Sequence, residues 1–191
     1  MAVSNRRLSQ AIAEGAGISL LFEMGEGRAA GDTLGAEGVV VRGAVFAQGD
    51  SELPVLAYTA TPDEAAALGA DAVVVAADTD DDDLLTFADR AAELGLELVV
   101  RADDADDVAR VLETLDPEIF LLAAGADGDD DDRPLERLLG LLPDVPAGKL
   151  AIAELSDATR ADVEELERAG VDAVVVSGNV GELSGESVPD V

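Results

Sequence analysis

The sequence predicts an α/β fold, a compact eight-stranded parallel β/α barrel of the TIM type, and three observations support this. Eight short segments rich in valine, leucine and alanine recur along the 191 residues. The phrase Gly-Ala-Asp-Ala-Val-Val-Val at 69–75 returns with small changes at 35–41 and 170–176. A glycine that ends a helix, followed by a β-branched strand buried on both faces, is typical of parallel β/α units.

The expected elements alternate along the chain. Strands are expected at 18–24, 38–46, 54–60, 72–78, 96–102, 118–125, 149–155 and 172–179. Helices are expected at 62–69, 81–94, 104–115, 133–142 and 157–169, with Asp104 and Asp157 as N-caps and Pro134 in a first turn. The connections 25–37 and 47–53 are too short or too rich in glycine for full helices. We therefore expect reduced or missing helices after strands 1, 2 and 8.

Closure of the sheet is favoured by the number of strands. Residues 1–180 are expected to form one barrel domain, and residues 181–191, rich in Gly, Ser and Pro, a flexible tail. Barrels of this type usually have at least about 200 residues. A barrel formed by this chain of 191 residues must therefore be shorter than usual. The alternative is an open, doubly wound parallel sheet. Its nucleotide-binding form is disfavoured because no Gly-x-Gly-x-x-Gly or Walker-type loop follows a strand.

The charge balance indicates a protein adapted to concentrated salt. The chain has 42 acidic and 12 basic residues, a formal net charge of −30, and its one lysine is Lys149. So much like charge destabilises a compact state by self-repulsion. In about 1 M salt the Debye length is only about 3 Å, which removes most of that repulsion. We therefore expect a halophilic protein.

Several classes of function are disfavoured by composition. With no cysteine and no histidine, disulfides, thiol chemistry, histidine-based catalytic pairs and the usual zinc sites are absent. The lack of a Lys/Arg cluster argues against nucleic acid. No apolar run approaches the 18 or so residues of a membrane span, and the start lacks a signal peptide's apolar stretch. A cytoplasmic location and no membrane partner are expected.

Parts of the chain resemble indole-3-glycerol-phosphate synthase, a ribulose-phosphate-binding β/α barrel of tryptophan biosynthesis. The similar stretches are Leu68–Val75, Ala92–Val100 and Thr159–Val176. Ile18–Met24 is similar to the family's first strand, and Pro54–Leu56 to the strand before its catalytic lysine. The resemblance covers nearly the whole chain. It implies a barrel whose functional groups lie at the C-terminal strand ends.

The chain departs from this family at most of the catalytic positions. Glu23 and Glu154 match family glutamates. The family's first-strand lysine, general-acid lysine, catalytic glutamate, sixth-strand asparagine and seventh-strand serine are replaced by Gly25, Tyr58, Arg101, Ala124 and Leu155, respectively. A tyrosine with an ordinary pKa near 10 is a poor general acid, and an arginine cannot act as a base. We therefore predict that the carbon–carbon lyase reaction of the family is lost.

A small set of mostly polar residues is expected at the C-terminal ends of the strands. They are Glu23, Arg42, Tyr58, Asp78, Arg101, Gly125, Glu154, Ser177, Gly178 and Asn179. Arg42 and Arg101 interrupt valine-rich strands, and with Tyr58 they could clamp a phosphate or carboxylate. Alternatively they pair with Glu23 and Glu154 in an internal salt network that plugs the barrel, or they face outward.

A phosphate site is a further expectation of the resemblance. The family binds phosphate with backbone N–H groups after strands seven and eight, and the matching stretches are Ser156–Asp157 and Ser177–Asn179. Gly178 permits close approach of an anion. Glycine, serine and asparagine after a strand are also ordinary turn residues.

No metal or cofactor is expected. The aspartate runs at 78 and 80–83 and at 127 and 129–132 lack the glycine and glutamate of a calcium loop. Helix capping and an acidic halophilic surface explain both runs.

Two functions remain open from the sequence. The first is a catalytically degenerate or repurposed synthase-like barrel that serves as a binding or interaction module. The second is an enzyme acting on a phosphorylated small molecule, with Glu23 or Glu154 as acid/base and Arg101 as anion anchor. An anionic or phosphorylated small molecule is the expected ligand. Short crossovers would uncover apolar strand surface, which predicts a homo-oligomer.

Overall fold

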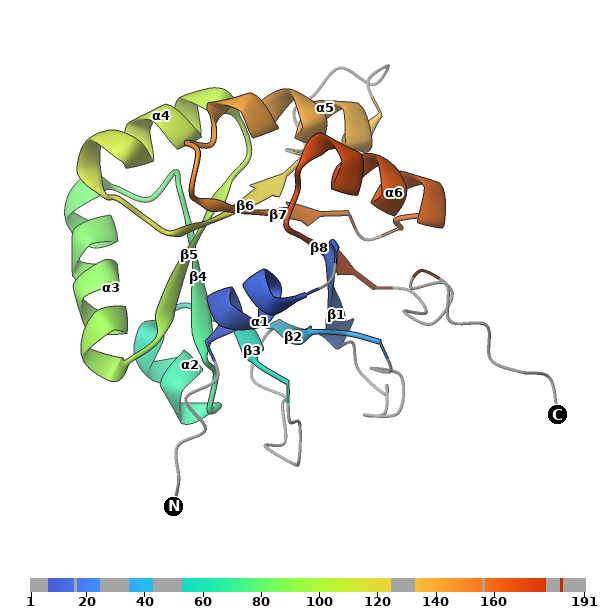
Figure 1. Ribbon diagram of the computed structural model, residues 1–191. Coiled ribbons are helices and arrows are strands. Elements are labelled where there is room, and N and C mark those ends of the chain that lie inside the picture. Colours follow the sequence, from blue (N-terminus) through green and yellow to red (C-terminus); the bar gives the residue numbers. More distant parts are fainter. Residues whose placement is uncertain are drawn as a thin grey trace, which may run out of the picture.

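Eight parallel strands close into a barrel (Figure 1). The computed structural model describes residues 7–15, 17–24, 35–42, 53–124, 133–155, 157–177 and 183. Each strand pairs with the next along the chain, and β8 pairs with β1 to complete the ring. The predicted TIM-type (βα)8 barrel is confirmed, and the alternative of an open sheet is wrong.

Each strand lies within the segment expected for it. The strands are β1 (Ser19–Met24), β2 (Gly38–Arg42), β3 (Val55–Tyr58), β4 (Ala72–Ala76), β5 (Glu97–Ala102), β6 (Ile119–Ala123), β7 (Leu150–Glu154) and β8 (Ala173–Val176). Their runs of Val, Leu, Ile and Ala are nearly all buried because one face lines the barrel and the other packs under helices.

The five expected helices follow β3 to β7 and surround the outside of the barrel (Figure 1). They are α2 (Pro62–Ala67), α3 (Asp81–Leu94), α4 (Ala105–Thr114), α5 (Pro134–Leu141) and α6 (Arg160–Ala169), and a short 3₁₀ turn, η2 (Leu142–Asp144), extends α5. Most of the residues after β1, β2 and β8, including all of the expected tail except Leu183, lie outside the described residues.

The helix ends follow local capping chemistry. Asp104 caps α4 as predicted, and its side chain accepts a hydrogen bond from the backbone N–H of Asp107. The expected cap at Asp157 is wrong. Thr159 caps α6 instead, because Thr159 and Asp162 satisfy each other's backbone N–H groups in a capping box. Gly170 ends α6 in the left-handed conformation, at φ 97°.

A helix that was not predicted, α1 (Leu8–Glu14), closes the N-terminal end of the barrel. Leu8 and Ile12 are 0% and 3% exposed and belong to the cluster that fills the barrel interior. The Ser9 backbone N–H and hydroxyl both donate to the carboxylate of Glu97 at the start of β5. Gly38 leaves room for this packing, since a Cβ there would lie 2.8 Å from a methyl carbon of Leu21.

Alternation along the strands separates the interior from the outer face. The interior cluster takes Leu21, Val40, Leu56, Ala72, Val74, Val99, Ile119, Leu121, Ile152, Ala173 and Val175. Residues on the opposite face, such as Phe22, Val100 and Phe120, form a separate cluster with helix residues. The side chain two positions after an interior residue faces inward again. The polar strand ends are therefore directed toward the barrel axis.

The outer faces of β2 and β3 are covered in the single chain. Val39, Val41 and Val55 are only 1%, 3% and 5% exposed. The premise that this strand surface is open was wrong, and the homo-oligomer stays a prediction without that support. Among the described residues, Leu85 is the exposed large apolar side chain. None of the described helices is long and apolar enough to cross a membrane.

Candidate functional site

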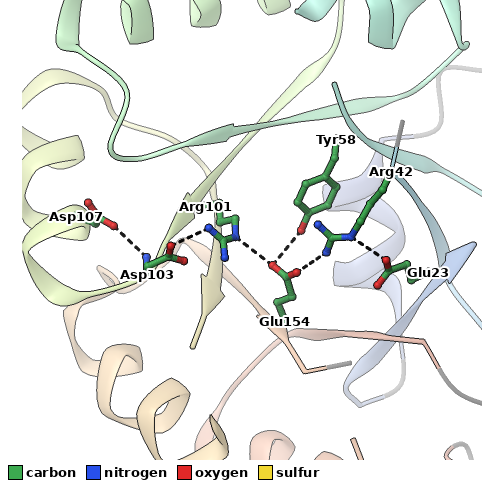
Figure 2. A network of polar contacts seen from close by, with 7 residues as sticks. All are labelled: Glu23, Arg42, Tyr58, Arg101, Asp103, Asp107 and Glu154. Atoms are coloured by element: carbon green, nitrogen blue, oxygen red, sulfur yellow. Dashed lines mark hydrogen bonds and ion pairs between the residues drawn. The ribbon is translucent and has the colours of Figure 1, made fainter. Parts of the chain in front are cut away.

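Five predicted residues meet at the C-terminal ends of the strands, and we call this group the rim network (Figure 2). Its members are Glu23 of β1, Arg42 of β2, Tyr58 of β3, Arg101 of β5 and Glu154 of β7. Each lies two residues after an interior apolar residue of its strand. Both arginines thus face the barrel interior, and the alternative that they face outward is wrong.

Glu154 lies at the centre of the network. One carboxylate oxygen, Oε1, accepts a short hydrogen bond from Nη2 of Arg42. The other, Oε2, accepts from the Tyr58 hydroxyl at 3.2 Å and from Nε of Arg101 at 3.2 Å. Three donors from three strands therefore converge on one carboxylate (Figure 2).

Arg42 joins the two glutamates and stacks on Tyr58. Its Nε donates to Oε1 of Glu23 at 2.8 Å while its Nη2 holds Glu154. Its guanidinium carbon lies 3.8 Å from the centroid of the Tyr58 ring, a cation–π contact. The register explains the stacking, because Arg42 and Tyr58 are paired positions of neighbouring strands.

The network extends beyond the residues expected from the sequence. Nη1 of Arg101 donates to Oδ2 of Asp103 at 2.8 Å, and the Asp103 backbone N–H donates to Asp107 at 3.0 Å. Among the described residues, no group hydrogen-bonds to the buried Oδ1 of Asp103. These aspartates were missed because they lie among surface carboxylates. The position of Asp103 directly after the strand that carries Arg101 was the available signal.

The rim network is half-buried and nearly balanced in charge. The side chain of Glu154 is 16% exposed, that of Glu23 20%, and those of Arg42 and Arg101 37% and 30%. Two arginines face two glutamates, with Asp103 at one edge. Such pairing offsets the cost of removing charges from water, which would be high for any one of them alone.

Burial and Glu154 favour the neutral form of Tyr58. Burial raises the pKa of the Tyr58 hydroxyl above its ordinary value, and Glu154 raises it further, while Arg42 opposes the shift. Burial alone would lower the pKa of Arg42, but Tyr58, Glu154 and Glu23 raise it above its ordinary value. Both effects keep Tyr58 a hydrogen-bond donor and Arg42 a cation.

The structure describes only some of the other predicted site residues. Ser177 follows β8 and is half-buried, while Gly178 and Asn179 lie outside the described residues, as do Ser156 and Gly125. Asp78 is exposed, and Asp81–Asp83 form the exposed first turn of α3. In the described ranges no group of three or more acidic side chains could hold a metal ion. The second aspartate run, at 127 and 129–132, lies outside them.

A hollow of about 590 Å³ lies at the opposite end of the barrel from the rim network. Glu97 and Ile119, the first residues of β5 and β6, line it together with Leu96, Leu115 and Arg7. The wall mixes apolar side chains with acidic ones. None of its lining residues belongs to the rim network.

Comparison with known proteins shows the fold. No known family profile matches the sequence, and no curated protein sequence is detectably similar. The structure of 3-hexulose-6-phosphate synthase from Salmonella typhimurium is similar with a TM-score of 0.65 and 18% identity, covering 88% of this chain and 97% of that one. A second structure of a 3-hexulose-6-phosphate synthase gives 0.67 and 16%, covering 88% and 99%.

Both structures are 3-hexulose-6-phosphate synthases, whereas the sequence resembles indole-3-glycerol-phosphate synthase. Neither is an indole-3-glycerol-phosphate synthase, so kinship with that family stays a prediction. At 16–18% identity the similarity shows the architecture of the fold but does not show the reaction or the ligand. The chain is a TIM-type (βα)8 barrel, similar over most of its length to the barrels of 3-hexulose-6-phosphate synthases.

Proposed function

We propose that this chain is a binding or interaction module of a halophile, built on a barrel of the kind used by phosphosugar enzymes, and that it does not catalyse indole-ring closure. One observation carries the proposal. Both carboxylates that could act as acid or base, Glu23 and Glu154, are held by arginines of the same chain.

The family's general acid and one of its catalytic glutamates are replaced by groups that cannot perform their roles, and the retained Glu154 is engaged by other residues of the chain. A general acid must release its proton near the working pH. The Tyr58 hydroxyl is poorly suited to this, because burial and Glu154 raise its pKa. Arg101 replaces a catalytic glutamate and cannot accept a proton. Glu154 has both oxygens engaged by three donors, which leaves little room for a substrate proton.

The test is an assay of the purified chain in potassium chloride of about 1 M, where self-repulsion is screened. The substrate is the ribulotide that indole-3-glycerol-phosphate synthases convert, and an active synthase that tolerates this salt is the positive control. We expect no indole product above the rate without protein. Product formed by this chain and abolished in Glu154→Gln would contradict the proposal.

A second candidate function is action on a phosphorylated small molecule, with Glu23 or Glu154 as acid/base and Arg101 as anion anchor. The specific observation in its favour is the likeness to two synthases whose names refer to a hexulose 6-phosphate. Arg42 and Arg101 also retain 37% and 30% exposure at the rim.

Calorimetric titration with ketose 6-phosphates tests whether the rim binds the class of ligand that the second candidate requires. Saturable binding that is lost in Arg101→Ala but kept in Arg160→Ala supports the second. Arg160 is a suitable control because it is an exposed arginine of α6 paired only locally with Glu164, among the described contacts. The absence of binding supports a module that does not use phosphorylated sugars.

A further inference from the structure

The groups around Glu154 have the arrangement of an anion receptor. Arg42 supplies an N–H to one oxygen, and Tyr58 and Arg101 supply an O–H and an N–H to the other. Charge-assisted hydrogen bonds of this kind, divided between the two oxygens of a planar group, match the geometry of a carboxylate, although arginines also bind phosphates in this way. The occupant here is a side chain of the chain itself.

The three donors have supports that do not depend on Glu154. Arg42 is held by Glu23 at 2.8 Å and by stacking on the Tyr58 ring at 3.8 Å. Arg101 is held by Asp103 at 2.8 Å. Tyr58 packs against the interior apolar cluster. Removal of the Glu154 carboxylate would therefore leave three donors facing a vacated, partly buried space, which is an unfavourable state.

We propose that the rim of this barrel is a binding site for small monocarboxylates that is occupied, in the intact chain, by the side chain of Glu154. The inference rests on the proposed function in treating the rim as a binding site and not as a catalytic one. Tethering gives the Glu154 carboxylate a high effective concentration. Free anions are therefore excluded from the intact rim until Glu154 is withdrawn.

Glu154→Ala tests the proposal because it removes a fragment equivalent to acetate, the γ-carbon with its carboxylate. Thermal unfolding is followed in potassium acetate and in potassium chloride at the same ionic strength. We expect acetate to raise the Tm of the variant by about 5–10 °C more than chloride, at a concentration about 100-fold above its Kd. The intact chain measures the general salt effect of acetate and should show no such excess.

Two further variants show whether the rim is responsible. Glu154→Ala combined with Arg101→Ala lacks one donor, and the excess effect of acetate should be lost. Glu23→Ala loses a carboxylate that accepts from Arg42 alone among the described residues, and it retains Glu154 in the receptor. It should behave like the intact chain. Sulfate or phosphate that matched acetate in Glu154→Ala would overturn the assignment to carboxylates.

Tyr58 provides a second readout within the site. It is the only tyrosine, and the chain has no tryptophan, so the near-ultraviolet fluorescence of the folded protein reports on the rim. Acetate should change that fluorescence saturably in Glu154→Ala and not in the intact chain. Equal responses in both proteins, or none in either, would overturn the proposal.

The proposal can still be tested if Glu154→Ala does not fold. The variant would then be refolded in acetate and in chloride, and recovery of the folded state in acetate alone supports the proposal. A chain that stays unfolded in both salts contradicts it. These measurements do not involve turnover. Indole product in the synthase assay would overturn the proposed function without changing the acetate result, and the reverse also holds.

Discussion

The two ends of this barrel are closed by opposite kinds of chemistry. At the N-terminal end, α1 inserts Leu8 and Ile12 among apolar interior side chains, and both are almost fully buried. At the C-terminal end, Glu154 gathers Arg42 and Arg101 into a half-buried network of ion pairs. The first closure is stabilised by removal of apolar surface from water, and the second by direct pairing of charges that are costly to bury.

The two closures are expected to have different roles: the apolar one stabilises the fold, and the charged one sets the specificity of binding. An apolar plug gains free energy wherever shapes fit, and a neighbouring apolar side chain can replace part of it. A charge network is satisfied by one arrangement, since each group left without its partner is penalised. We therefore expect the N-terminal end to contribute more to the free energy of unfolding. We expect the rim network to determine which ligands the barrel binds.

The largest effect is expected at the apolar end. Leu8→Ala removes a fully buried side chain and leaves a cavity, and it should lower the free energy of unfolding by about 2–5 kcal/mol. Denaturant titration in molar salt measures this. Leu85→Ala is the matched control, because Leu85 is 41% exposed and should change the free energy by less than about 0.5 kcal/mol. Equal effects of the two variants would mean that α1 does not close the barrel.

A smaller loss is expected when the rim loses its central charge. Glu154→Gln weakens the contacts to two arginines and should lower the free energy of unfolding by about 1–3 kcal/mol. Glu164→Gln is the control, since Glu164 pairs with Arg160 on the exposed face of α6 and should cost about 0.3–0.5 kcal/mol. A rim variant as harmless as this control would show that the network is not formed in solution.

Tyr58 should contribute less, and in a way that depends on pH. Tyr58→Phe removes one hydrogen bond to Glu154, worth about 0.5–1.5 kcal/mol. In the folded chain burial and Glu154 raise the pKa of Tyr58 above the unfolded value near 10. The folded state therefore retains the proton longer than the unfolded state. Ionisation of Tyr58 leaves the free energy of unfolding unchanged below about pH 10 and lowers it as the pH rises above that value.

Spectrophotometric titration measures that shift directly, because the chain has a single tyrosine. The phenolate should form at a higher pH in the folded chain than in denaturant. Glu154→Gln should bring the folded-state pKa back toward the ordinary value, since Glu154 contributes to the shift. A phenol that titrates normally in the folded chain would place Tyr58 outside the network.

The smallest expected effect is the change that salt makes in the destabilisation caused by Glu154→Gln and by Leu8→Ala. Raising potassium chloride from about 0.1 M to about 1 M shortens the Debye length from about 10 Å to about 3 Å. The destabilisation caused by Glu154→Gln should shrink by at most about 0.5 kcal/mol, because its partners are partly exposed. That caused by Leu8→Ala should not shrink. A similar response in both variants would contradict the contrast between the two ends.

Much of the fold followed from local patterns. Valine runs after left-handed glycines predicted β2, β4 and β8, other short apolar segments predicted the remaining strands, and the stretches of helical character between them predicted α2 to α6. Helix α1 was missed, although Leu8 and Ile12 have the i, i+4 spacing of one helical face. A short helix with two apolar residues carries little signal, because its stability comes from the barrel end that it covers.

The sequence alone determined which residues reach the strand ends, since strand position and alternation are local properties. It also determined the acidic character, which depends only on composition. Only the tertiary structure decided that the sheet closes and that Glu154 takes donors from β2, β3 and β5 at once. Closure pairs β1 with β8, the rim network joins residues as far as 112 positions apart, and no local pattern encodes contacts over such separations.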